Sequence, residues 1–197
     1  MLRTAVKSFL DDFKSQFIEQ MKIWETSNLG IKYNLGDLTR IRTGKLDANA
    51  NVDKGRYPFF TCSREPLKID SYSFDCECVL VAGNGELNVK YYDGKFDAYQ
   101  RTYVIESKDK GIVKVPYIYR FLINYVKDLQ DQAIGGIIKY IKMENLMNAQ
   151  IIVPSAEEQD KLLSFVAQSD KSKFHIRKLI QMKITIWQKG GKIYANI

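Results

Sequence analysis

Residues 134–159, IGGIIKYIKMENLMNAQIIVPSAEEQ, contain the signals that decide how the central domain closes. The two glycines at the start predict a tight turn, and a short helix is expected around residues 143–147. Ile151, Ile152 and Val153 then form an apolar run that is typical of a buried strand, and Pro154 ends it. The stretch therefore predicts the order turn, short helix, strand and exit.

A long helix is predicted to begin at Ser155, where Ser155-x-x-Glu158 has the spacing of a capping box. Carboxylates in the first turn also favour a helix start. Apolar residues then recur at nearly alternating spacings of four and three up to residue 189, a pattern that suits coiled-coil pairing with another helix. These predicted dimerisation residues are Leu162, Val166, Ile176, Ile180, Ile184 and Trp187.

Three further regions are expected around this helix. Residues 1–27 carry apolar side chains three or four positions apart, which predicts an N-terminal amphipathic helix. Residues 31–154 contain short β-branched and aromatic runs separated by Gly, Asn and Asp, which predict strands with sharp turns at Gly83-Asn84-Gly85 and Asp93-Gly94. A helix is expected from Pro116, and residues 190–197 form a tail. The predicted class is α+β, mainly β, between two long helices.

The composition indicates a globular protein of one domain with an appendage: 197 residues, 45% hydrophobic and 27% charged. No run approaches the roughly 20 apolar residues that cross a bilayer, so we expect a cytoplasmic protein without membrane contact. Three cysteines leave one unpaired, and a zinc site at Cys76-x-Cys78 lacks partner ligands. Reduced thiols, no metal site and no cofactor are expected.

Basic charge is the main functional signal in the composition. The net charge is +7, and basic residues recur between positions 32 and 64 among Asn, Thr and Gly. Basic loops of this kind are typical of nucleic-acid binding, but solvated surface charge explains them equally well.

Catalytic motifs are incomplete. Gly83-Asn84-Gly85 lacks the third glycine of a cofactor loop and is followed by a strand pattern, and no Pro-Pro methyltransferase motif is present. Asp93 or Asp97 with Glu106-Ser107-Lys108 has the outline of a metal nuclease site, but the Glu-x-Lys falls in a turn. The sequence favours a non-catalytic protein.

Five segments of the central domain occur in a fixed order: YNLGDL with Ile41 and Gly44, YPFFTCS from Tyr57, VLVAGNG from Val79, the stretch from Phe96 to Thr102, and residues 134–159. In this order they resemble the target-recognition domain of the DNA specificity subunits of type I restriction–modification systems. Such subunits usually carry two of these domains, separated by long helices. This chain has one, so it resembles a half-subunit, either naturally short or truncated.

The resemblance implies a subunit that binds double-stranded DNA, reads half of a bipartite site and directs methyltransferase and restriction subunits. A homodimer through residues 155–189 is expected to supply the second half. A stand-alone dimeric DNA-binding repressor is the alternative, and a scaffold that binds no nucleic acid is a third class.

Loop residues at strand ends are the candidate DNA contacts. The phosphate candidates are Arg42, Lys45, Lys54 and Arg56. The candidates for base or groove contact are Thr61, Ser63, Arg64, Asn84, Tyr99, Gln100 and Arg101, with Lys139 on a neighbouring face.

Overall fold

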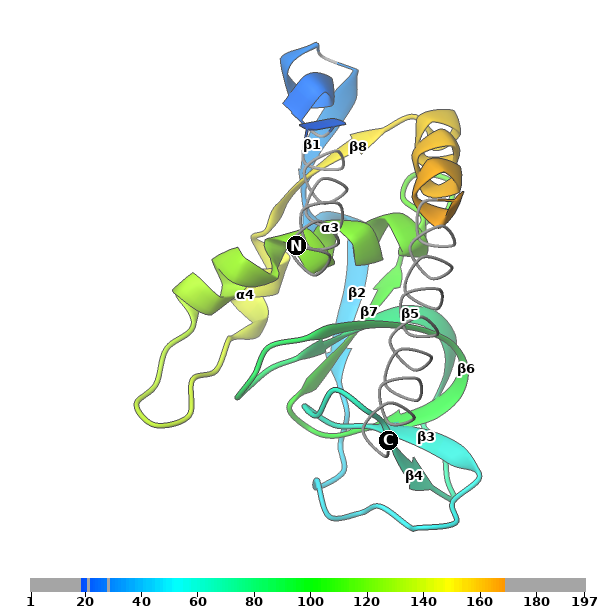
Figure 1. Ribbon diagram of the computed structural model, residues 1–197, viewed down its shortest axis with the longest axis vertical. Helices are drawn as coiled ribbons and strands as arrows, with labels where there is room; N and C mark the ends of the chain where they lie inside the picture. Colours follow the sequence, from blue (N-terminus) through cyan, green and yellow to red (C-terminus); the bar gives the residue numbers. More distant parts are fainter. Residues whose placement is uncertain (1–18, 21, 28, 169–197) are drawn as a thin grey trace, which may run out of the picture. The chain divides into compact units, whose positions relative to one another are not determined.

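The computed structural model describes residues 19–20, 22–27 and 29–168 (Figure 1). The chain divides into two compact units, of which residues 18–159 form one and residues 1–17 with 160–197 form the other. All labelled helices and strands belong to the first unit. It combines sheets and helices, as the predicted α+β class requires.

Two strands join the beginning and the end of this unit. β1 (Gly30–Asn34) pairs antiparallel with β8 (Gln150–Pro154), with Ile31 opposite Val153. The buried strand predicted before Pro154 is therefore confirmed, although its partner lies about 120 residues away in the chain, a separation that only the structure reveals.

The second sheet has six strands in the order β2-β7-β5-β6-β3-β4. All neighbours are antiparallel except β3 and β6, which run parallel. The strands are β2 (Thr39–Thr43), β3 (Tyr57–Phe60), β4 (Leu67–Ile69), β5 (Phe74–Ala82), β6 (Val89–Ala98) and β7 (Thr102–Ser107).

This sheet curls, because the chain that leaves β2 meets the end of β6, which is several strands away. Leu46 bridges to Tyr99, and Figure 1 shows β5 and β6 bending through a wide arc. At the closure a Cβ on Gly44 would lie 1.8 Å from the carbonyl oxygen of Ala98. Only glycine permits this approach, which explains the glycine that follows Ile41 in the first family-like segment.

The hydrophobic core fills the curl and continues under a helix. Phe74 stacks on Phe96 with ring centroids 5.0 Å apart, next to the fully buried Leu80. α3 (Val115–Gln132) packs against β5 and β6. The Tyr117 hydroxyl of α3 donates a hydrogen bond to the carbonyl oxygen of Ile152 in β8 at 2.6 Å, and so ties the helix to the two-stranded sheet.

The helices of the central domain follow the sequence prediction in two places and depart from it in a third. α3 and α4 (Met143–Met147) are confirmed. The segment LGDL, expected within a strand region, forms the helical turn α2 (Leu35–Leu38). Leu35 and Leu38 are both buried three positions apart, and Gly36 packs against Met147 of α4. Tertiary packing of this helical face outweighs the strand-like neighbours.

The prediction of a sharp turn at Asp93-Gly94 is wrong. Both residues lie inside β6, and pairing with β5 continues through them, with Cys76 opposite Gly94. Gly94 does adopt a positive φ of 128°. The expected positive φ is therefore correct, but the chain does not reverse direction at this glycine. The turn at Gly83-Asn84-Gly85 joins β5 to β6, and Gly85 has a φ of 66°.

The long helix begins where it was predicted. Residues 156–168 are helical, and the Ser155 hydroxyl oxygen accepts a hydrogen bond from the Glu158 backbone N–H at 3.3 Å. Leu162 and Val166 lie on this helix. The remaining dimerisation residues, Ile176, Ile180, Ile184 and Trp187, lie outside the described residues. So does most of the predicted N-terminal helix, of which residues 19–20 and 22–26 are described and helical.

In the part of the chain that the structure describes, no helix is long and apolar enough to cross a membrane. The three cysteines carry free thiols. Burial, assisted by the neighbouring Glu106 carboxylate, raises the pKa of Cys76 to about 11.

Candidate nucleic-acid interface

Four loop segments meet at one end of the six-stranded sheet: residues 61–64, 83–88, 99–101 and 139–141. Backbone hydrogen bonds join three of them. The Gly83 N–H donates to the Arg101 carbonyl oxygen at 2.8 Å, and the Gly85 N–H donates to that of Lys139 at 2.9 Å. The Ile141 N–H in turn donates to the Gly83 carbonyl oxygen at 2.9 Å. The end of β5 is thus held between two other segments.

The segment after β3 joins the same group. The Tyr99 N–H donates to the Phe60 carbonyl oxygen at 2.9 Å, and the Asn88 side-chain amide donates to that of Cys62 at 2.8 Å. Thr61 is buried, and its hydroxyl oxygen accepts the Ser63 N–H at 3.2 Å. Thr61 therefore shapes the turn, whereas the neighbouring Ser63 is exposed.

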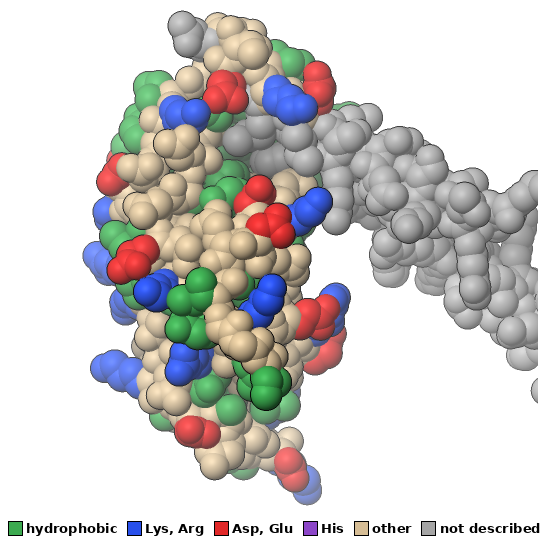
Figure 2. All heavy atoms as spheres, turned by 90° about the vertical axis from the view of Figure 1, so that its left-hand side faces the viewer, with side chains coloured by type: hydrophobic (Ala, Val, Ile, Leu, Met, Phe, Trp, Pro, Cys, Tyr) green, Lys and Arg blue, Asp and Glu red, His purple; other side chains and the backbone are tan. Residues whose placement is uncertain are grey.

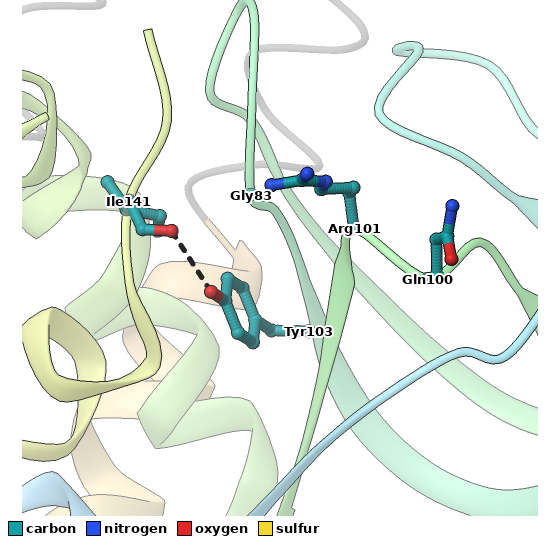
Figure 3. A pocket seen from close by; sticks show the side chains of 5 residues that line it. All are labelled: Gly83, Gln100, Arg101, Tyr103 and Ile141. Carbon is teal, nitrogen blue, oxygen red and sulfur yellow. Dashed lines mark hydrogen bonds between the residues drawn. The ribbon is translucent and has the colours of Figure 1, made fainter. Parts of the chain in front are cut away.

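An open pocket of about 300 Å³ lies among these segments, lined by Gly83, Gln100, Arg101, Tyr103 and Ile141 (Figure 3). The Tyr103 hydroxyl donates a hydrogen bond to the Ile141 carbonyl oxygen at 3.0 Å. Burial raises the pKa of Tyr103, so this hydroxyl keeps its proton at neutral pH. A Cβ on Gly83 would come within 2.5 Å of the Arg101 carbonyl oxygen, so the strand end needs a glycine there.

Several of the candidate residues are brought together around this pocket. Figure 3 shows the Arg101 side chain extending toward the strand end at Gly83, with Gln100 next to Arg101 on the same turn. The Gln100 N–H donates to the Leu46 carbonyl oxygen at 3.0 Å, which places Lys45 beside them. The polar candidates at this end of the sheet are Lys45, Ser63, Arg64, Asn84, Gln100, Arg101 and Lys139. We call this group the sheet-end cluster.

Other basic candidates lie elsewhere or beside carboxylates. Lys54 and Arg56 precede β3, at the opposite end of that strand from Thr61. The Arg56 guanidinium lies 3.8 Å from the Asp70 carboxylate.

Two more arginines are paired with glutamates. Arg42 forms an ion pair with Glu106 and lies 5.1 Å from the centre of the Phe74 ring. Arg64 pairs with Glu86, and this contact raises the pKa of Arg64 and lowers that of Glu86. Tyr99 is partly buried, and its backbone serves the closure of the sheet.

The residues that resembled a nuclease site have structural partners. Glu106 pairs with Arg42, and the Lys108 amino group donates to the carbonyl oxygens of Gly36 and Asp37 at 2.9 and 3.1 Å. Asp97 is buried and accepts the Ser73 hydroxyl at 2.9 Å. Within the described ranges, no group of three or more His, Cys, Asp or Glu side chains could hold a metal ion.

Sequence reasoning missed residues that complete the site. Tyr103 and Ile141 line the pocket. Their roles depend on contacts between distant segments, which local patterns do not reveal. The neighbouring loop also exposes Ile137 and Ile138. The sequence does carry a signal for this pair, since two apolar residues directly follow a Gly-Gly turn.

Comparison with known proteins agrees with this fold. The family model of the type I restriction modification DNA specificity domain matches residues 30–185. The chain belongs to this family, as the resemblance of its five segments predicted. It is 40% identical over 152 residues to the type I restriction enzyme EcoDI specificity subunit of Escherichia coli, a match that covers 75% of this chain and 34% of that protein.

Solved structures show the same fold. The S subunit of a type I restriction-modification system from M. genitalium superposes with a TM-score of 0.66 at 18% identity, covering 78% of this chain and 42% of that one. The HsdS subunit from Thermoanaerobacter tengcongensis gives a TM-score of 0.61 at 12% identity, covering 90% and 49%. The chain thus spans about a third of the curated relative and about half of these structures.

Proposed function

We propose that residues 31–154 bind double-stranded DNA and read half of a bipartite site. The observation that carries this proposal is the sheet-end cluster, where five segments of the chain meet and present amide, hydroxyl and cationic side chains, with Gln100 and Arg101 lining an open pocket. Direct readout of a base pair requires such donors and acceptors on a rigid support.

Within this cluster the side chains divide into two roles. Arg101 suits guanine, whose O6 and N7 accept a bidentate contact, and the amides of Gln100 and Asn84 suit adenine. Lys45 and Lys139 are exposed cations in the cluster that can hold phosphates. Arg64 becomes available to DNA if it leaves Glu86, an exchange that is inexpensive because exposed ion pairs contribute little.

The chain acts as a non-catalytic specificity subunit that directs methyltransferase and restriction subunits. This part of the proposal is supported by family membership and by the structural partners found for Glu106, Lys108 and Asp97. The partner subunits carry out the reactions, and this domain recognises the target sequence.

A second recognition domain is supplied by another copy through the helix of residues 155–189. At 1.5 Å per residue, a helix over all of these residues would be about 50 Å long. Antiparallel pairing would place two recognition domains at the ends of a rod, and half-sites would be separated by roughly one turn of DNA or somewhat more. The apolar stripe that ends at Trp187 supports this pairing, since it needs a partner surface.

Binding measurements with matched variants test DNA recognition. A preferred duplex is selected from a randomised library, and affinities are measured for the selected and scrambled sequences. Arg101→Ala and Gln100→Ala are expected to cost about 1–3 kcal/mol of discrimination at one base pair while sparing non-specific affinity. Arg40→Ala and Gln130→Ala, exposed positions outside the cluster, are the controls. Equal effects of all four variants would remove the proposal.

Partner and oligomer measurements test the remainder. Co-purification with methyltransferase subunits separates a specificity subunit from a stand-alone repressor. Sedimentation should show a dimer at tens of micromolar, and Ile180→Asp should weaken it by several kcal/mol because a charge would enter the helix seam. A monomeric unmodified chain at that concentration contradicts the dimer.

A further inference from the structure

The loop of residues 134–140, which we call the tip loop, presents two bare isoleucines. The Ile134 N–H donates to the Tyr140 carbonyl oxygen at 3.0 Å, and the reverse hydrogen bond is 2.8 Å, so the loop is closed at its base. Ile137 is fully exposed at the tip, and Ile138 is 63% exposed. Two adjacent β-branched apolar side chains gain nothing from this position in water, which indicates a surface that they contact.

Glycine fixes how these side chains are displayed. Gly135 has a φ of 116°, and a Cβ there would lie 2.6 Å from the Ile138 carbonyl oxygen. The turn at Gly135 therefore admits glycine and little else. Its close approach to the Ile138 backbone places Ile137 and Ile138 at the exposed end of the loop.

The tip loop is anchored to the sheet-end cluster. Lys139 of the loop is held by the Gly85–Lys139 backbone hydrogen bond, and Ile141, which directly follows the loop, is held by Gly83 and by the Tyr103 hydroxyl. Figure 1 shows the loop projecting beyond α4 on the left of the view. On that side of the structure, Figure 2 shows exposed hydrophobic side chains among Lys and Arg side chains.

The charges beside the tip favour a polyanion. Lys139 and Lys142 are exposed on the segment that returns from the tip, Arg101 lies across the pocket, and Glu144 is the one acidic residue in residues 134–145. A bare apolar tip between cations matches a DNA groove, where phosphates flank the bases. The apolar feature that bases offer in the major groove is the methyl group of thymine.

We infer that the tip loop enters the major groove beside Arg101 and that Ile137 and Ile138 contact thymine methyl groups of the recognised half-site. This inference rests on the proposed function and deepens it, since it assigns apolar readout of A·T pairs to a loop next to the polar cluster. Lys139 and Lys142 hold phosphates on the side from which the chain returns from the inserted tip.

Replacing thymine by deoxyuridine, which lacks the methyl group, tests the contact. The full-length chain is bound to its selected duplex, and each thymine is replaced in turn. At one or more positions, loss of the methyl group should weaken binding by the unmodified chain about fourfold. This is the change in affinity that corresponds to the free energy of burying one methyl group. The double variant Ile137→Ala, Ile138→Ala should bind both duplexes equally. Ile31→Ala, 64% exposed on β1, is the control and should keep the unmodified response.

The remaining outcomes separate this inference from the function on which it rests. One outcome is that the chain selects a sequence and Arg101→Ala weakens that sequence preference, while replacing thymine by deoxyuridine affects the unmodified chain and the tip variant alike. The inference alone is then wrong. If the tip variant keeps its DNA binding and loses co-purifying methyltransferase, the tip is a protein-docking element and the inference is also wrong. If the unmodified chain selects no sequence, the proposed function fails and this inference fails with it.

Discussion

The side-chain oxygen of Gln159 accepts a hydrogen bond from the backbone N–H of Lys114 at 3.0 Å, across 45 positions of the chain. Gln159 is fully buried, and its amide nitrogen donates to the carbonyl oxygens of Ile112 and Pro154 at 2.8 and 3.1 Å. One amide thus fastens the end of β8 to the turn that begins α3. The glutamine of the Glu-Glu-Gln segment after Pro154 therefore has a structural role: it makes this set of hydrogen bonds, which we call the Gln159 bracket.

Gln159→Ala should lower the free energy of unfolding by about 2–4 kcal/mol, because one substitution leaves several buried backbone groups without a partner. Urea unfolding measures the change. Gln130→Ala on the exposed side of α3 removes the same side chain and should change stability by no more than about 0.5 kcal/mol. Comparable losses in the two variants would mean that the bracket is unimportant.

Tyr117 should make stability fall at alkaline pH. Burial raises its pKa above the usual value, so the folded protein keeps a proton that the unfolded chain loses. Its contribution is complete below about pH 10 and decreases as the pH rises further.

Tyr117→Phe should therefore cost about 1–2 kcal/mol at pH 7, where the hydrogen bond to Ile152 is lost. Above pH 10 the slope of unfolding free energy against pH should become shallower by up to about 1.4 kcal/mol per pH unit. Denaturant titrations from pH 7 to 11.5 give both values. An unchanged slope would show that another group governs the alkaline loss.

Local sequence signals predicted much of the fold. The capping box at Ser155, the apolar run before Pro154 and the apolar face of α3 each specify an element without help from distant residues. The failures at LGDL and Asp93-Gly94 arose where packing of Leu35 and Leu38, or pairing of β6 with β5, decided the structure. Local preference does not contain that information.

The candidate site was predictable only as a set of loops. Gln100 and Arg101 were visible as polar residues in a turn. Their proximity to Lys139 depends on hydrogen bonds from the Gly83–Gly85 turn to Arg101, Lys139 and Ile141, which span 18 to 58 positions of the chain. Likewise, nothing local to Arg42 or Arg56 reveals that Glu106 and Asp70 lie beside them. From the sequence, all basic loops are equally good candidates for DNA contact. In the folded chain, Arg42 and Arg56 lie beside carboxylates, whereas Lys45 and Lys139 belong to the sheet-end cluster.

Salt dependence should divide the basic residues in the same way. Lys45→Ala or Lys139→Ala should flatten the slope of log affinity against log salt by about 0.9, because each variant loses one phosphate contact. Arg56→Ala should have a smaller effect, since the Asp70 carboxylate lies nearby and the residue is at the other end of β3. Fluorescence anisotropy on random-sequence duplex at several salt concentrations provides the slopes. A flatter slope for Arg56→Ala alone would move the phosphate contacts to the region before β3.

Photocrosslinking from defined positions tests the central claim, that DNA binds at the sheet-end cluster. A benzophenone amino acid replaces Gln100 in one variant and Arg56 in another, and each is irradiated with the selected duplex. The account predicts crosslinks from position 100 to bases of the half-site and none from position 56. Crosslinks from position 56, with none from position 100, would contradict it.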